Sequence, residues 1–145
     1  MRVALDTNIL AYAEGVNGVA RKKAALAILH KLPSEETFVP VQALGELFAV
    51  LVRKVGRTPS RARDAIQSWQ DAFSSIETSA GVLASAMDLA AGHNLGIWDS
   101  IILSASAVVG CRFLLSEDLQ DGFTWNGVTV LNPFGTGVLE RVLGE

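Results

Sequence analysis

The sequence has few of the features that would place it among secreted, disulfide-bonded or membrane proteins. Cys111 is the only cysteine in 145 residues, which excludes an internal disulfide framework and favours a reducing compartment. Ser, Gly or charged residues interrupt every apolar stretch well short of the roughly 18 residues that a membrane span requires. No basic segment followed by an apolar signal region is found near Met1. We therefore expect a cytoplasmic protein without membrane association.

Residues for several common catalytic sites are missing as well. The two histidines, His30 and His93, are far apart, and with a single cysteine no zinc-binding spacing exists. The sequence contains neither a Gly-rich phosphate loop nor the nucleophile elbow of serine hydrolases. The sequence therefore supports these kinds of site less well than one built from carboxylates.

Charge is also sparse, at 19% of residues with a net charge of −3, which argues against a generic basic nucleic-acid binder. That argument weakens if acids surround a divalent cation, because a metal-loaded site attracts phosphate. Basic residues are concentrated in one stretch, which contains Arg53, Lys54, Arg57, Arg61 and Arg63. Such a run is either a solvated face or a contact surface for an RNA backbone, with Arg53, Lys54 and Arg57 as candidates.

The pattern of apolar residues and breakers predicts one α/β domain over residues 1–145. Half of the residues are hydrophobic, and the length suits a single domain. We expect strands at 2–6, 37–39, 76–78, 112–115 and 128–131, and helices at 7–14, 19–32, 41–55, 58–73, 79–93 and 97–109. Strands that alternate with helices predict a mostly parallel sheet covered on both faces.

Asp6 ends the first predicted strand, followed by Thr7 and Asn8. Ligands of open α/β sheets gather beyond the carboxyl ends of the strands, so a carboxylate there is well placed for a site. Alone, Asp6 is equally well interpreted as a helix N-cap, and Thr7 and Asn8 as local turn residues.

Three further acids fall in informative positions. Glu46 shares one narrow polar strip with Gln42 and Arg53 on a helix that is otherwise apolar, so it either faces solvent or points into a cleft. Asp99 follows Trp98 in the first turn of an apolar helix, where the helix dipole favours an acid regardless of function. Asp118 belongs to a polar turn that follows a strand and contains three acids, Glu117, Asp118 and Asp121.

A parallel sheet would bring these four carboxylates, Asp6, Glu46, Asp99 and Asp118, to one edge. Carboxylate oxygens are hard ligands that suit Mg²⁺ or Mn²⁺. Such a cation can activate water and offset charge on a phosphodiester, which predicts a metal-dependent phosphodiesterase.

At these positions the sequence resembles PIN-domain ribonucleases, specifically VapC-type toxins of toxin–antitoxin pairs. The resemblance covers nearly the whole chain and rests on four motifs, Leu5-Asp6-Thr7-Asn8-Ile9-Leu10, Gln42-Ala43-Leu44-Gly45-Glu46, Trp98-Asp99-Ser100 and Leu115-Ser116-Glu117-Asp118-Leu119-Gln120-Asp121-Gly122. It implies a PIN-like α/β/α sandwich with about five strands and an Mg²⁺- or Mn²⁺-dependent endoribonuclease. It also implies a homodimer and a VapB-like antitoxin partner whose peptide covers the groove.

The resemblance assigns the family's three main acids to Asp6, Glu46 and Asp99, and the fourth to Asp118. Asp121 is the alternative fourth acid or a supporting one, and Thr7, Asn8 and Ser116 match supporting polar positions. A different function also fits the motifs, a PIN-like module that binds RNA or a partner protein without cutting.

Overall fold

A computed structural model describes residues 1–144 of the chain. Its six strands are β1 (Val3–Leu5), β2 (Thr37–Pro40), β3 (Ser74–Ile76), β4 (Phe113–Leu115), β5 (Thr124–Trp125) and β6 (Val128–Leu131). They form one sheet in the order β3-β2-β1-β4-β6-β5. Every neighbouring pair is parallel except β5 and β6. The sheet is therefore mostly parallel, with β1 near its centre.

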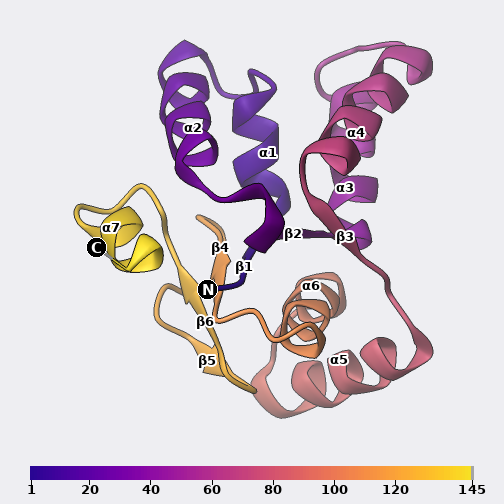
Figure 1. Cartoon of the computed structure of the whole chain (residues 1–145). Coiled ribbons are helices and arrows are strands. Elements are labelled where there is room, and N and C mark those ends of the chain that lie inside the picture. Colours follow the sequence, from indigo (N-terminus) through magenta and orange to yellow (C-terminus); the bar gives the residue numbers. More distant parts are fainter. Residues whose placement is uncertain (145) are drawn as a thin grey trace.

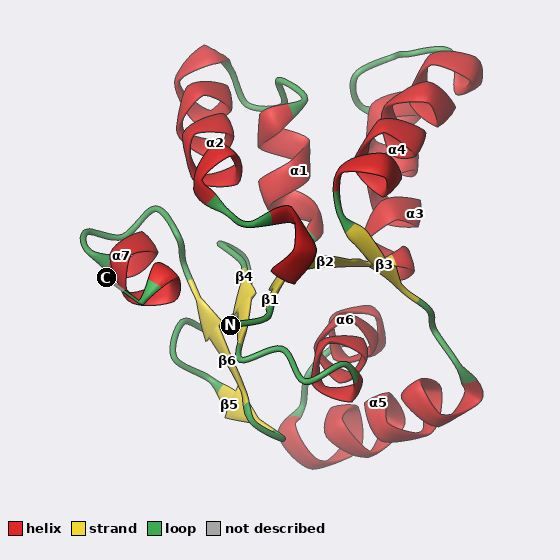
Figure 2. Cartoon of the chain, viewed as in Figure 1, coloured by secondary structure: helices red, strands yellow, loops and turns green. Residues whose placement is uncertain are grey.

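Seven α-helices within residues 1–144 flank the sheet: α1 (Thr7–Ala13), α2 (Val19–Lys31), α3 (Val41–Arg53), α4 (Pro59–Ala72), α5 (Ala80–His93), α6 (Ile97–Val108) and α7 (Val138–Leu143). A short 3₁₀ helix, Ser34–Glu36, precedes β2. Helices α1 to α4 lie on one side of the sheet and α5 and α6 on the other (Figure 1; Figure 2). The strand order explains this division. The connections from β1 to β2 and from β2 to β3 run in one direction along the sheet, and the connection from β3 to β4 runs back in the other. Because crossovers are right-handed, the two directions place their helices on opposite faces. The predicted α/β sandwich is confirmed.

Three details differ from the sequence-based expectation. The sheet has six strands rather than about five, because Asn126 and Gly127 form a two-residue turn that pairs Trp125 with Val128. Both turn residues have positive φ, 47° and 83°, as hairpin turns of this kind require. Strand β3 also begins two residues before the predicted 76–78 segment, since its register pairs Ser74 with Phe38 and Ile76 with Pro40. Helix α7 was not predicted.

The core lies between the sheet and both helix layers. Leu5, Leu114 and Leu115 from the central strands are fully buried, as are Leu47 of α3 and Ile102 of α6. Burying one side chain of this size contributes about 1.5–3 kcal/mol. The single cysteine, Cys111, is part of this core, and burial raises the pKa of its thiol to about 12. Cys111 therefore packs as a small apolar residue with a protonated thiol.

The parallel strands place the ends of β1, β2 and β4 at one edge of the sheet. Asp6 follows β1 directly, α3 starts immediately after β2, and Ser116 follows β4. Backbone hydrogen bonds continue the pairing past the strand ends, from Asp6 N to Leu115 O (3.0 Å) and from Ser116 N to Leu131 O (3.0 Å). Residues far apart in the sequence are therefore held rigidly beside Asp6. No helix within residues 1–144 is long and apolar enough to cross a membrane.

Candidate active site

Asp6 is a buried carboxylate surrounded by neutral hydrogen-bond donors. Its Oδ1 accepts a hydrogen bond from the backbone N–H of Thr7 (2.8 Å), so Asp6 does cap α1. Its Oδ2 accepts bonds from the Ser116 hydroxyl (2.7 Å) and the Asn8 side-chain amide (3.3 Å). Asp6 is only 4% exposed. Its two interpretations, as a helix cap and as a site residue, are thus compatible, because each carboxylate oxygen has its own partners.

Burial raises the pKa of Asp6 from 3.8 to about 6. The hydrogen bonds from Ser116 and Thr7 oppose this shift, whereas the nearby carboxylates of Asp99 and Asp118 reinforce it. A carboxylate that is buried near other carboxylates is unfavourable when charged. A cation bound at this position would remove that cost.

Glu46, on α3, is a second carboxylate near Asp6. The space among Asp6, Glu46, Asp99 and Asp118 is called the acidic cleft below. The pKa of Glu46 is raised by burial, and the charges of Asp6 and Asp99 raise it further. The side-chain amide of Gln42, one turn earlier, donates to Glu46 Oε2 (3.4 Å) and partly offsets the shift. Thr7 connects the two helices, since its hydroxyl donates to the backbone oxygen of Ala43 (3.5 Å). The polar strip predicted on this helix therefore lies next to Asp6.

Asp99 contributes a third carboxylate from the first turn of α6. Its pKa is raised by burial and by the charge of Asp118. The neighbouring Trp98 is 60% exposed, so its ring lies largely at the surface beside Asp99. The side chain of Ser100 is fully buried, and its hydroxyl has no hydrogen-bond partner within the described chain.

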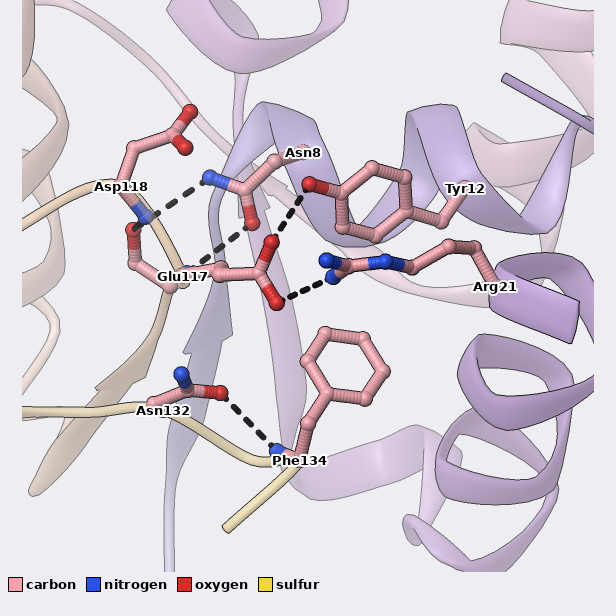
Figure 3. Close-up of polar contacts among 8 residues, drawn as sticks. Asn8, Tyr12, Arg21, Glu117, Asp118, Asn132 and Phe134 are labelled. Atoms are coloured by element: carbon pink, nitrogen blue, oxygen red, sulfur yellow. Dashed lines mark hydrogen bonds and ion pairs between the residues drawn. The ribbon is translucent and has the colours of Figure 1, made fainter. Parts of the chain in front are cut away.

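The three acids that follow β4 have different environments. The Glu117 carboxylate forms an ion pair with Arg21 and accepts a hydrogen bond from the Tyr12 hydroxyl (2.7 Å). Asp121 Oδ1 accepts a bond from the backbone N–H of Asn132 (2.9 Å). Figure 3 shows the Glu117 side chain extending toward Tyr12 and Arg21 while that of Asp118 extends away from them.

Asp118 is the member of this turn that lies in the acidic cleft. It raises the pKa values of Asp6 and Asp99, whereas Asp121 affects neither. Ser116 determines the backbone position of Asp118, because its hydroxyl oxygen accepts the N–H groups of Asp118 and Leu119, both at 3.2 Å. The geometry thus favours Asp118 over Asp121 as the fourth acid.

These acids have the donor chemistry of a divalent-cation site. Within residues 1–144, none of the four carboxylates is paired with a Lys, Arg or His side chain. Hard oxygen donors without a protein counter-ion are the ligands that Mg²⁺ and Mn²⁺ prefer. As the side chains stand, no three potential ligands in the described part of the chain are gathered closely enough to hold a metal ion. The residues fit such a cation by the chemistry of their oxygen donors.

A groove of about 320 Å³ extends from the acids along α1 and α3. Thr7, Asn8, Glu46 and Asp118 line one end of it, and Asn17 and Lys54 line the other. Lys54 follows Glu46 by eight positions, which corresponds to roughly 12 Å along the helix. Arg53 and Lys54 are exposed. Arg57, by contrast, is held by Glu14, to which it donates at 2.6 Å and 3.0 Å, so its guanidinium is engaged within the fold.

Sequence reasoning missed the partners of the turn acids. Glu117 pairs with Arg21 across 96 positions in the chain, and Asp121 contacts Asn132. Nothing in the local sequence indicates which acid Arg21 contacts.

Comparisons with known proteins agree with the fold and the motifs. The PIN domain family model matches residues 3–120. Comparison with curated proteins finds no match. Among solved structures, the chain is similar to the Mycobacterium tuberculosis VapC20 toxin, described as cleaving the sarcin–ricin loop, with a TM-score of 0.67, 17% identity, and coverage of 80% of this chain and 89% of that one.

Two further structures have comparable similarity. A chain of a toxin–antitoxin complex from Klebsiella pneumoniae has a TM-score of 0.66 and 21% identity, covering 88% of this chain and 95% of that one. FitAcB from Neisseria gonorrhoeae has a TM-score of 0.64 and 17% identity, covering 91% of this chain and 98% of that one. The chain therefore belongs to the PIN-domain family, and its structural neighbours are VapC- and FitB-type toxins.

Proposed function

We propose that this protein is a metal-dependent endoribonuclease that acts as the toxin of a toxin–antitoxin pair. The observation that carries the proposal is the buried, uncompensated carboxylate of Asp6, whose pKa is raised to about 6 beside the acids of α3, α6 and the β4 turn. Such a group is costly to the fold and suits a cation-dependent reaction.

Asp6, Asp99 and Asp118 would hold one or two Mg²⁺ or Mn²⁺ ions, with Glu46 contributing directly or through water. The bound cation would supply polarisation of a water molecule and compensation of phosphate charge. Ser116, Asn8 and Thr7 orient Asp6 through the hydrogen bonds described above.

Glu46 lies at the mouth of the groove, where its raised pKa suits it to accept a proton from the attacking water. Water attacks the phosphorus of an RNA phosphodiester and the bond to the 3′ oxygen breaks. The products carry a 5′-phosphate and a 3′-hydroxyl. Lys54, at the end of the groove away from the acids, and its exposed neighbour Arg53 would bind the RNA backbone.

The proposal is tested by incubating the purified protein with a mixed RNA pool. We expect cleavage with Mn²⁺ or Mg²⁺, loss of cleavage on chelation, and recovery when the cation is added back. RNA binding without cleavage under all of these conditions would instead support a non-catalytic PIN-like binding module.

Substitution of the exposed basic residues should weaken RNA binding rather than the chemical step. A plot of the logarithm of the RNA association constant against the logarithm of salt concentration has a negative slope. Lys54→Gln and Arg53→Gln should each make that slope shallower by about 0.7, the value for one phosphate contact on a single strand. Lys31→Gln, at the exposed end of α2, is the control and should leave the slope unchanged. Equal slopes for all variants would remove Arg53 and Lys54 from the RNA interface.

Two partners belong to this proposal. Some similar structures are toxin–antitoxin complexes, which supports a VapB-like antitoxin as the protein partner of this chain. Its peptide would cover the groove between α1 and α3 and block the acids. We also propose a homodimer, for which light scattering should give twice the 15.4 kDa mass of one chain.

A further inference from the structure

The acid that precedes Asp118 has a role other than metal binding. Both carboxylate oxygens of Glu117 are engaged, Oε1 by the Tyr12 hydroxyl at 2.7 Å and Oε2 by the guanidinium of Arg21. These contacts lower the pKa of Glu117 even though its burial acts in the opposite direction. Glu117 is therefore charged and turned away from the acidic cleft (Figure 3).

Aromatic rings fix the position of Arg21. Its guanidinium carbon lies 4.9 Å from the centre of the Tyr12 ring and 5.9 Å from that of Phe134, and the two rings are 5.9 Å apart. Tyr12 is only 6% exposed. A planar guanidinium placed against aromatic faces keeps its orientation better than a free side chain does. Arg21, Tyr12, Phe134 and Glu117 together are called the aromatic clamp below.

The aromatic clamp is connected to the metal-site acids by two short routes. The backbone N–H of Glu117 donates to Asn8 Oδ1 (3.1 Å), and the amide of Asn8 donates to Asp6. The second route runs through Ser116, whose hydroxyl donates to Asp6 Oδ2 and accepts from the backbone N–H of Asp118. By contrast, the Asp118 side chain forms no hydrogen bond or ion pair with the described residues. Its location depends on the backbone of the turn.

We propose that the aromatic clamp positions the turn after β4 so that Asp118 faces Asp6 and Asp99, with Arg21, Tyr12 and Glu117 acting as positioning residues. This inference rests on the proposed metal-dependent function. With the clamp intact, the Glu117 side chain is anchored by Tyr12 and Arg21, and Asp118 can reach the cleft. Without it, the turn rotates about its Ser116 anchor and one carboxylate is lost to the site. Partners of metal ligands commonly alter metal affinity by 10–100-fold when removed.

The test measures Mn²⁺ affinity, by calorimetric titration of the full chain without RNA, together with thermal stability. Tyr12→Phe deletes one hydrogen bond and retains the ring, and Glu117→Ala removes the centre of the clamp. Glu117→Gln keeps one oxygen acceptor, for either the Tyr12 hydroxyl or the Arg21 guanidinium, and places an NH2 group at the other position, so its affinity should fall between those of Glu117→Ala and the unaltered chain. The matched control is Glu14→Gln, which weakens the ion pair with Arg57 at the C-terminal end of α1, where the acid is about as buried as Glu117.

We expect Glu117→Ala to weaken Mn²⁺ binding by about 10–100-fold, Tyr12→Phe less, and Glu14→Gln not at all, even where the control lowers the melting temperature by as much. Unchanged Mn²⁺ affinity in both clamp variants, with tight binding by the unaltered chain, would overturn the aromatic clamp alone. An unaltered chain that binds no Mn²⁺ would overturn the proposed metal-dependent function and the clamp with it. A dissociation constant that changes in proportion to stability across all variants, Glu14→Gln included, would assign the clamp a purely structural role and also overturn it.

Discussion

Replacing Asp6 by Asn should reduce RNA cleavage by roughly 10³-fold, because the variant loses the most buried of the proposed metal ligands. A bound cation contributes several kcal/mol to the transition state, and each 1.36 kcal/mol corresponds to a factor of ten in rate. The new amide would also point donor hydrogens at the amide of Asn8, which now donates to Asp6 Oδ2. Single-turnover cleavage at saturating Mn²⁺ measures the effect.

The control for this variant is Asp64→Asn on α4, an exposed acid whose ion-pair partner among residues 1–144 is Arg63 at 3.6 Å. It removes the same charge from the chain at a distance from the acids, so cleavage should stay close to that of the unaltered protein. Comparing Asp118→Asn with Asp121→Asn identifies the fourth acid, and only the first should lose activity. Cleavage that survives in Asp6→Asn would show that the acids are assigned wrongly.

The metal-free protein should become less stable as the pH rises from about 5 to about 7.5, which is opposite to the usual behaviour of paired carboxylates. In the folded chain Asp6 keeps its proton up to a pKa of about 6, against 3.8 when unfolded. Between these values the folded state binds more protons, so the free energy of unfolding falls as pH increases. About one pH unit of this shift lies above pH 5, so the loss between pH 5 and pH 7.5 corresponds to roughly 1.4 kcal/mol. Glu46 and Asp99 are shifted in the same direction.

Urea unfolding of the chelated protein at the two pH values measures this effect, and Asp6→Asn serves as the reference that lacks the titrating group. Millimolar Mn²⁺ should reverse the trend at the higher pH, because the cation binds the ionised acids. Free Mn²⁺ at a hundred times its dissociation constant adds about 2.7 kcal/mol to the free energy of unfolding. A pH dependence identical in the unaltered chain and in Asp6→Asn, with no response to Mn²⁺, would contradict a functional acid cluster.

Much of the architecture could be predicted from local patterns. The alternation of apolar strands and helices indicated a parallel sheet, and proline or glycine marked several helix ends, as at Pro59 in α4. The first strand of the hairpin, β5, was missed although Asn126-Gly127 is a strong turn signal, because β5 contains only two residues. Strand β3 was displaced by two residues because its limits depend on pairing with β2, which is a non-local property.

The sequence by itself identified the candidate residues for the proposed chemistry, Asp6, Glu46, Asp99 and Asp118 in family-like motifs, and it contains no zinc-binding spacing or phosphate loop as an alternative. Only the tertiary structure decided how the turn acids divide their roles. Glu117 pairs with Arg21, and Asp121 accepts a hydrogen bond from the backbone N–H of Asn132. Asp118 is the acid of this turn that lies near Asp99. The physical reason is that a side chain's charge and proton affinity depend on its burial and neighbours. Those neighbours lie up to 110 positions away, as for Ser116 and Asp6.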